Sequence, residues 1–159
     1  MSPILTIKRL AATLVAVAIM AVVVPSQAAD PAAEPALAIT ADSPQLQWGP
    51  CPPFLPKGCG LSVLHGDTAK PNVDVFLKLP ANSKLPAHIH TSAERMILVA
   101  GELQVTYQGQ KMATLKPGSY AYGPAKRPHD GACVSATPCI LFIAFEGPLD
   151  ATPLAEAAH

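Results

Sequence analysis

The sequence lacks both an apolar run long enough to cross a bilayer and a cluster of basic residues. Its longest uncharged apolar stretch, Leu10 to Val24, has about fifteen residues, whereas a membrane-spanning helix needs about twenty. The 11 lysines and arginines are balanced by 11 aspartates and glutamates. Binding to nucleic-acid phosphates requires a concentration of positive charge, so this class of function is disfavoured.

The short apolar run has the layout of a secretory signal peptide. Lys8 and Arg9 precede it, and the small residues Ser26 and Ala28 follow it. We therefore expect residues 1–28 to be a signal peptide cleaved after Ala28, and the mature protein to be periplasmic or secreted with no membrane contact. An uncleaved membrane anchor is the alternative. No cysteine directly follows the run, so a lipid attachment site is lacking.

Helical periodicity is also lacking in the remaining chain, whose 159 residues leave room for one domain. Residues 29–46 are rich in alanine and proline and are expected to form a flexible leader; residues 47–148 are the predicted domain and 149–159 a C-terminal tail. Short runs of β-branched and aromatic residues between turn residues predict an all-β barrel or sandwich. The predicted strands are Gly60 to His65, Val73 to Leu79, Arg95 to Val99, Glu102 to Gln108, Ser119 to Tyr122 and Ile140 to Phe145.

Four cysteines form two close pairs along the chain. Because an exported protein matures where disulfides persist, we expect the bonds Cys51–Cys59 and Cys133–Cys139. A metal–thiolate site is the alternative, although neither spacing is the close CxxC type found in zinc ribbons.

Three histidines and one glutamate are the candidate metal ligands. His88 and His90 lie two positions apart in a strand-like stretch, so their imidazoles point to the same face. Glu94 follows after a turn, and His129 comes after a strand–turn–strand connection that folds back. Three imidazoles and a carboxylate suit one divalent ion such as Fe, Zn, Mn or Ni.

These residues resemble the two cupin motifs. His88-x-His90-x3-Glu94-x6-Gly101 is similar to the first motif, and Gly118-x5-Pro124-x4-His129 is similar to the second. The chain resembles the small exported single-domain cupins of the conserved-barrel type, cupin_2, over residues 48 to 148. The resemblance implies a cupin double-stranded β-helix, a jelly-roll-like barrel, in which these histidines and Glu94 hold the metal.

Three positions depart from the family pattern. Asn82 replaces the glycine that leads the first motif, although asparagine also adopts left-handed backbone angles. Lys126 replaces a second glycine and puts the local turn in question. Cys133 replaces the terminal asparagine of the second motif, which suggests that a disulfide fixes this segment.

The resemblance implies a metal-dependent reaction on a small organic molecule, with dioxygenase chemistry ahead of lyase or isomerase chemistry. Among the tyrosines near the predicted ligands, Tyr107, Tyr120 and Tyr122, we select Tyr122 as the general acid or base. A non-catalytic module that binds or senses a metal or small ligand is the alternative function. The expected partner is a second copy of the chain, because cupins commonly dimerise through edge strands.

Overall fold

The computed structural model describes residues 35–155, which form strands, turns and loops. The predicted signal peptide, residues 1–28, lies outside the described residues, as do residues 29–34 of the predicted leader and the last four residues of the chain. Within the part that the structure describes, no helix is long and apolar enough to cross a membrane.

Most strands between residues 35 and 155 carry buried side chains at alternate positions, as expected for sheets with one face in a core. All six strands predicted from the sequence form, with ends shifted by at most one residue. The strands are β1 (Gly49–Pro50), β2 (Gly60–His65), β3 (Val73–Leu79), β4 (Ser83–Ile89), β5 (Glu94–Ala100), β6 (Leu103–Tyr107), β7 (Ala113–Leu115), β8 (Tyr120–Gly123), β9 (His129–Cys133), β10 (Cys139–Phe145) and β11 (Thr152–Pro153).

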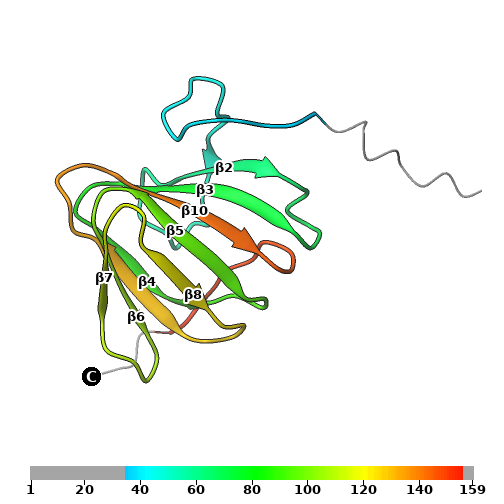
Figure 1. The fold of residues 1–159 in the computed structure, drawn as a ribbon. Helices are drawn as coiled ribbons and strands as arrows, with labels where there is room; N and C mark the ends of the chain where they lie inside the picture. The colour runs from blue at the N-terminus through cyan, green and yellow to red at the C-terminus, as the bar shows by residue number, and fades with distance from the viewer. Residues whose placement is uncertain (1–34, 156–159) are drawn as a thin grey trace, which may run out of the picture. The chain divides into compact units, whose positions relative to one another are not determined.

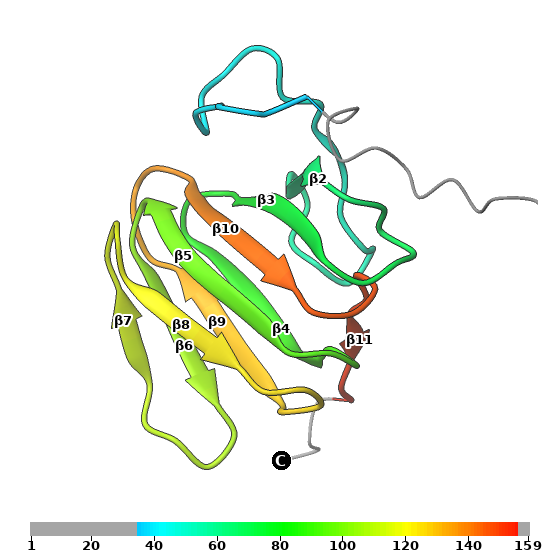
Figure 2. The ribbon, with the colours of Figure 1, turned by 45° about the vertical axis from the view of Figure 1, so that its right-hand side comes forward.

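The strands pair in two antiparallel sheets, and the chain passes repeatedly from one sheet to the other (Figure 1 and Figure 2). One sheet has the order β1-β2-β3-β10-β5-β8, and the other has the order β11-β4-β9-β6-β7. From β3 to β11 consecutive strands alternate between the sheets, apart from the β6–β7 hairpin. This arrangement is a double-stranded β-helix, which confirms the predicted all-β, jelly-roll-like fold class.

The core consists of aliphatic side chains that point inward from the two sheets. Val73, Val75, Leu79 and Leu98 are fully buried, and Leu103 is 2% exposed. Complete burial of one such side chain contributes about 1.5–3 kcal/mol to stability, before the cost of ordering it. Because alternate residues on each strand share a face, this packing also fixes which polar side chains point between the sheets.

Strand β9 was not among the strands predicted from the sequence. Its five residues include Asp130 and Gly131, which are poor strand formers, and no Val, Ile or aromatic residue other than His129. The strand forms because it lies between β4 and β6 and pairs with both. Hydrogen bonding to two neighbours therefore outweighs its local preference.

The two residues that replace glycines of the cupin motifs, Asn82 and Lys126, keep the left-handed backbone angle that the turns need. Asn82 has φ 52° and Lys126 has φ 60°. The Lys126 backbone N–H also donates a hydrogen bond of 2.8 Å to the His90 carbonyl. The second-motif turn is thus fixed to the first-motif segment despite the absence of a glycine.

The cysteines form the two predicted disulfides. Cys51 and Cys59 are linked beside the β1–β2 pair, and Cys133 at the end of β9 is linked to Cys139 at the start of β10. The second bond joins the two sheets, because β9 and β10 belong to different ones.

Candidate metal centre

Strands β4 and β9 place two histidines face to face. His88 on β4 is the direct partner of His129, the first residue of β9, and directly paired residues point to the same side of a sheet. Both imidazoles face the interior, with exposures of 4% and 5%, and their ring centroids are 4.2 Å apart. His90, two residues after His88, lies on the same side and is also buried.

Glu94 reaches the same space from the opposite sheet. It is the first residue of β5, it pairs with Gly123 on β8, and its side chain is almost completely buried. The Glu94 Oε1 atom is 3.3 Å from the His129 Nε2 atom, and the Oε2 atom is 3.6 Å from the His90 Nε2 atom. The structure thus brings together all four residues that the motifs select.

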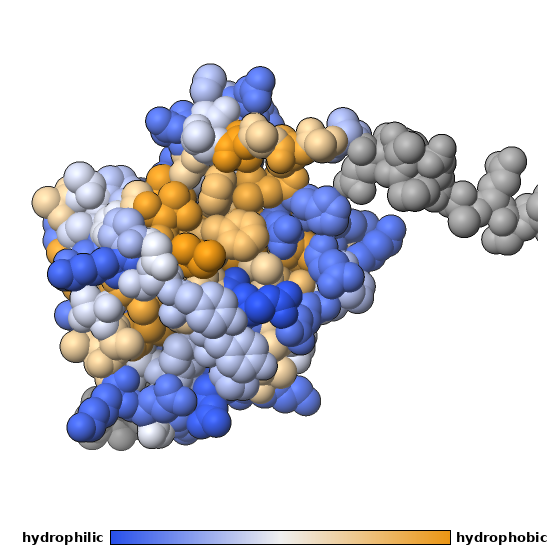
Figure 3. Space-filling model, in the orientation of Figure 1, coloured by the Kyte–Doolittle hydropathy of each residue, from blue (hydrophilic) through white to orange (hydrophobic). Residues whose placement is uncertain are grey.

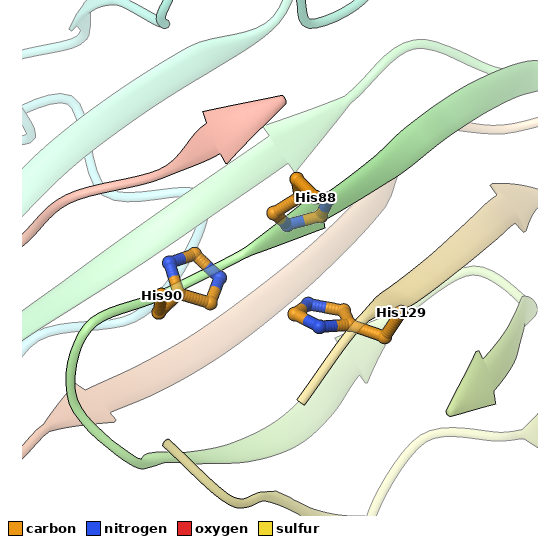
Figure 4. A group of neighbouring side chains, drawn as sticks. All are labelled: His88, His90 and His129. Atoms are coloured by element: carbon orange, nitrogen blue, oxygen red, sulfur yellow. The ribbon is translucent and has the colours of Figure 1, made fainter. Parts of the chain in front are cut away.

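The three histidines lie at a spacing that could hold a metal ion, with one nitrogen of each ring within 4.8 Å of the others. Figure 4 shows His88, on β4, and His90, directly after the end of β4, pointing toward His129 on β9. Zinc, iron and similar ions bind imidazole nitrogens at about 2 Å, so one ion between the rings would contact all three after small side-chain adjustments.

Backbone carbonyls orient each imidazole through its Nδ1 atom. His88 Nδ1 donates to the Pro86 carbonyl at 2.7 Å, His129 Nδ1 donates to the Arg127 carbonyl at 3.0 Å, and His90 Nδ1 donates to the Asp150 carbonyl. A carbonyl only accepts, so each Nδ1 atom carries a hydrogen, and each neutral ring keeps its Nε2 lone pair for a ligand.

Burial sets the charge state of the group. It lowers the pKa values of His88 and His129 to about 4 and also lowers the pKa of His90, so the rings are neutral near pH 7. Burial raises the Glu94 pKa to about 7. Glu94 Oε1 is buried and has no hydrogen-bond partner among residues 35–155, and an unpaired buried carboxylate is costly. Three neutral nitrogen donors beside this unsatisfied carboxylate fit a divalent cation.

A cavity of about 60 Å³ lies beside the four residues and has predominantly apolar walls. The walls include Pro52, Leu55, Leu77, Leu85, Met96, Leu103, Val105, Gly131, Leu141, Phe145, Leu149, Asp150 and Ala151. Phe76 and Phe142 pack edge to face, with ring centroids 6.4 Å apart, and neither is part of the cavity wall.

Tyr122 does not lie in this cavity. It pairs with Arg95 on β5, next to the Glu94–Gly123 pair, so alternation directs it to the face opposite Glu94, and its side chain is 49% exposed. The role of Tyr122 as general acid or base stays a prediction that this placement does not support.

Tyr107 is the tyrosine beside the candidate ligands. Its ring centroid is 5.4 Å from that of His129, and its buried hydroxyl has no hydrogen-bond partner in the part of the chain that the structure describes. Burial raises the pKa of this hydroxyl, which therefore stays protonated. The alternation of Leu103, Val105 and Tyr107 along β6 is the sequence signal that could have selected it.

Asp150 is a second contributor that sequence reasoning missed. Besides its carbonyl contact with His90, its side-chain Oδ1 accepts a hydrogen bond of 2.9 Å from the Thr91 backbone N–H. Residues 152–153 then pair with β4 as β11. The first part of the predicted C-terminal tail thus forms one side of the site.

Comparison with known proteins gives a family and a fold. Residues 37–150 match the profile described as the ChrR cupin-like domain. No curated protein matches the chain.

Three solved structures illustrate the likeness. The acetylacetone dioxygenase from Acinetobacter johnsonii is 20% identical with a TM-score of 0.58, and the match covers 77% of this chain and 79% of that one. The polyketide cyclase RemF from Streptomyces resistomycificus is 18% identical with a TM-score of 0.58, covering 76% and 89%. The DMSP lyase DddQ from Ruegeria pomeroyi DSS-3 is 21% identical with a TM-score of 0.57, covering 70% and 61%.

The chain spans only 61% of the length of DddQ, and it spans 63% of the length of a second solved DMSP lyase structure that it matches. At these identities the likeness shows the fold alone.

Proposed function

The chain belongs to the family of ChrR cupin-like domains, within the cupin superfamily, and we propose that it binds one divalent metal ion through His88, His90, Glu94 and His129 to act on a small organic molecule. The observation that carries this proposal is a group of three oriented imidazoles beside Glu94, whose buried Oε1 atom has no hydrogen-bond partner among the described residues. Natural interiors seldom leave such an oxygen unsatisfied without a functional reason.

The protein's own groups would prepare the site for a ligand. The three backbone carbonyls hold the imidazoles in one orientation, and the apolar walls limit the entry of water. The bound ion would supply a Lewis acid, or oxygen chemistry in the case of iron. The Tyr107 hydroxyl is a buried donor that has no hydrogen-bond partner among the described residues, and the Tyr107 ring centroid lies 5.4 Å from that of His129.

Dioxygenase chemistry is favoured over lyase or isomerase chemistry. The apolar cavity suits a small molecule with little polar surface, and this cavity is what supports the preference. A solved dioxygenase of acetylacetone shares the fold, but so do a solved lyase and a solved cyclase. The second candidate is a non-catalytic module that binds or senses a metal or small ligand, since the same four side chains would serve both purposes.

The proposal includes export and self-association. The signal-peptide pattern and the two disulfides support a periplasmic or secreted location. A homodimer is supported by exposed apolar residues on the outer face of β5 and of the edge strand β8, namely Ile97, Val99, Tyr120 and Tyr122. Figure 3 shows apolar side chains gathered over the face where Figure 1 places β3, β10 and β5.

Elemental analysis of the purified mature protein tests the metal assignment. We expect about one metal ion per chain, lost in His129→Ala and retained in the control His65→Ala, which changes an exposed histidine of β2 outside the group. Equal metal content in both variants would reject the site.

Turnover separates the two candidate functions. An enzyme loaded with iron should consume oxygen repeatedly with a small apolar substrate, whereas a binding module should saturate at one ligand per chain and form no product.

A further inference from the structure

The side of the cavity that approaches solvent is built mainly from two segments outside the long strands. Most wall residues on the strands are buried, whereas Pro52 and Leu55 on one segment and residues 149–151 on the other are partly exposed. A molecule that enters from solvent therefore has to pass these segments.

The first segment is a loop closed by a disulfide. Residues 51–59 connect β1 to β2, and the Cys51–Cys59 bond closes the loop at its base with a Cα–Cα distance of 5.7 Å. Both cysteines pack against the core. The loop's ends are thus held both by the sheet and by a covalent bond.

Turns and prolines further restrict this loop. The Leu55 N–H donates to the Pro52 carbonyl and the Cys59 N–H donates to the Pro56 carbonyl, each at 3.0 Å. Pro52, Pro53 and Pro56 each fix their own φ angle. The loop therefore enters the site as a pre-shaped wall and loses little conformational entropy when a ligand binds.

The loop also contacts a candidate metal ligand directly. The Phe54 ring centroid lies 5.8 Å from that of His88, and Leu55 lines the cavity beside it. The cavity volume of about 60 Å³ corresponds to about four to six water-sized atoms, since one water needs about 10–15 Å³ on this measure.

We infer that the disulfide-closed loop 51–59 is the specificity-determining wall of the metal pocket, with Leu55 and Pro52 restricting it to compact molecules with an apolar body. This inference rests on the proposed function, because it names the ligand class of the same site. None of the described residues that line the cavity is a lysine or an arginine, which agrees with an apolar ligand.

Two probes that bind metals through the same ring nitrogen test the inference. The protein is loaded with Co(II), whose visible absorption reports a change of ligands, and is titrated with imidazole and with 4-phenylimidazole. The first probe is compact, and the second adds a phenyl ring. The wild-type protein should bind imidazole and should bind 4-phenylimidazole at least about tenfold more weakly.

Leu55→Ala should remove this discrimination. It shortens a side chain of the wall without touching a metal ligand, so the affinity for 4-phenylimidazole should rise at least about tenfold while that for imidazole stays within about threefold. Lys57→Ala, an exposed change in the same loop that neither lines the cavity nor involves a proline, is the matched control and should alter neither affinity. Pro52→Ala is the second variant, and circular dichroism verifies that each variant is folded.

The outcomes separate the two proposals. A wild-type chain that takes up no Co(II) would overturn the proposed function and this inference with it. A chain that takes up Co(II) but binds both probes equally, or whose discrimination survives in folded Leu55→Ala and Pro52→Ala, would overturn the inference alone.

Discussion

A Cβ atom at Gly123 would lie 2.7 Å from Glu94 Oε1 and 2.9 Å from Glu94 Cγ. The two residues are direct partners across β8 and β5, and the Tyr107 ring closes the remaining side, with its Cε1 atom 3.2 Å from the same point. Glycine is therefore the residue that leaves room for the Glu94 carboxylate beside the three histidines.

Gly123→Ala should weaken metal binding because the added methyl group displaces Glu94. We expect a loss of about 10- to 100-fold in affinity, measured by competition with a chelator. Gly49→Ala is the control, since a Cβ atom there would come no closer than 3.7 Å to its surroundings. An unchanged affinity in folded Gly123→Ala would show that the carboxylate does not contribute to binding.

The metal-free protein should lose stability as the pH falls from 6.5 to 5. Unfolding lets His88 and His129, whose folded pKa values are about 4, take up protons below pH 6.5. Glu94, with a folded pKa of about 7, has the opposite effect above pH 4.5, but one carboxyl offsets only one of the two histidines. The net change from these three groups is about 1 kcal/mol per pH unit, and His90, whose pKa burial also lowers, adds to it.

Urea denaturation at pH 5.0 and 6.5 measures this slope. The double variant His88→Gln, His129→Gln removes two of the three histidines whose pKa values burial lowers, so the slope should become much smaller because Glu94 then offsets the remaining His90. A slope equal to that of the wild type would mean that other groups dominate the pH dependence.

Loss of the Cys133–Cys139 disulfide should destabilise the fold. The bond closes a short loop between strands of different sheets, and the chain-entropy model gives about 2 kcal/mol for a loop of this length. Cys133→Ala with Cys139→Ala should lower the free energy of unfolding by this amount under oxidising conditions. A free energy of unfolding equal to that of the wild type would show that the bond does not stabilise the fold.

Tyr122→Phe tests the sequence-based assignment of the general acid or base. Because Tyr122 is half exposed and faces away from Glu94, we expect ligand affinity and any turnover to stay within about twofold of the wild type. A large loss of turnover with unchanged metal content would instead support the original assignment.

Much of the fold and of the candidate site could be predicted because the motifs specify both the residue types and their spacing along the strands. The two-residue spacing of His88 and His90 determines a shared face, and the strands rich in β-branched residues formed close to their predicted bounds. Strand β9 was missed because its residues form a strand only through pairing with β4 and β6.

The residues that surround the site were harder to predict, because they act through the backbone or from distant parts of the chain. Asp150 orients His90 through a carbonyl, which every residue possesses, so its identity gave no signal. The direction of the Tyr122 side chain follows from its pairing with Arg95. This pairing depends on the strand register, which the sequence alone does not show.

The contact between Asp150 and His90 also constrains the order of events during biosynthesis. His90 depends for its orientation on a carbonyl that lies 60 residues further along the chain, and β11 pairs with β4 only after that point. A nascent chain that ends before residue 150 lacks the carbonyl that accepts the His90 Nδ1 hydrogen bond. Metal loading should therefore follow the completion of synthesis, so premature termination within the last strands would yield a chain that contains all four candidate ligands but binds metal weakly.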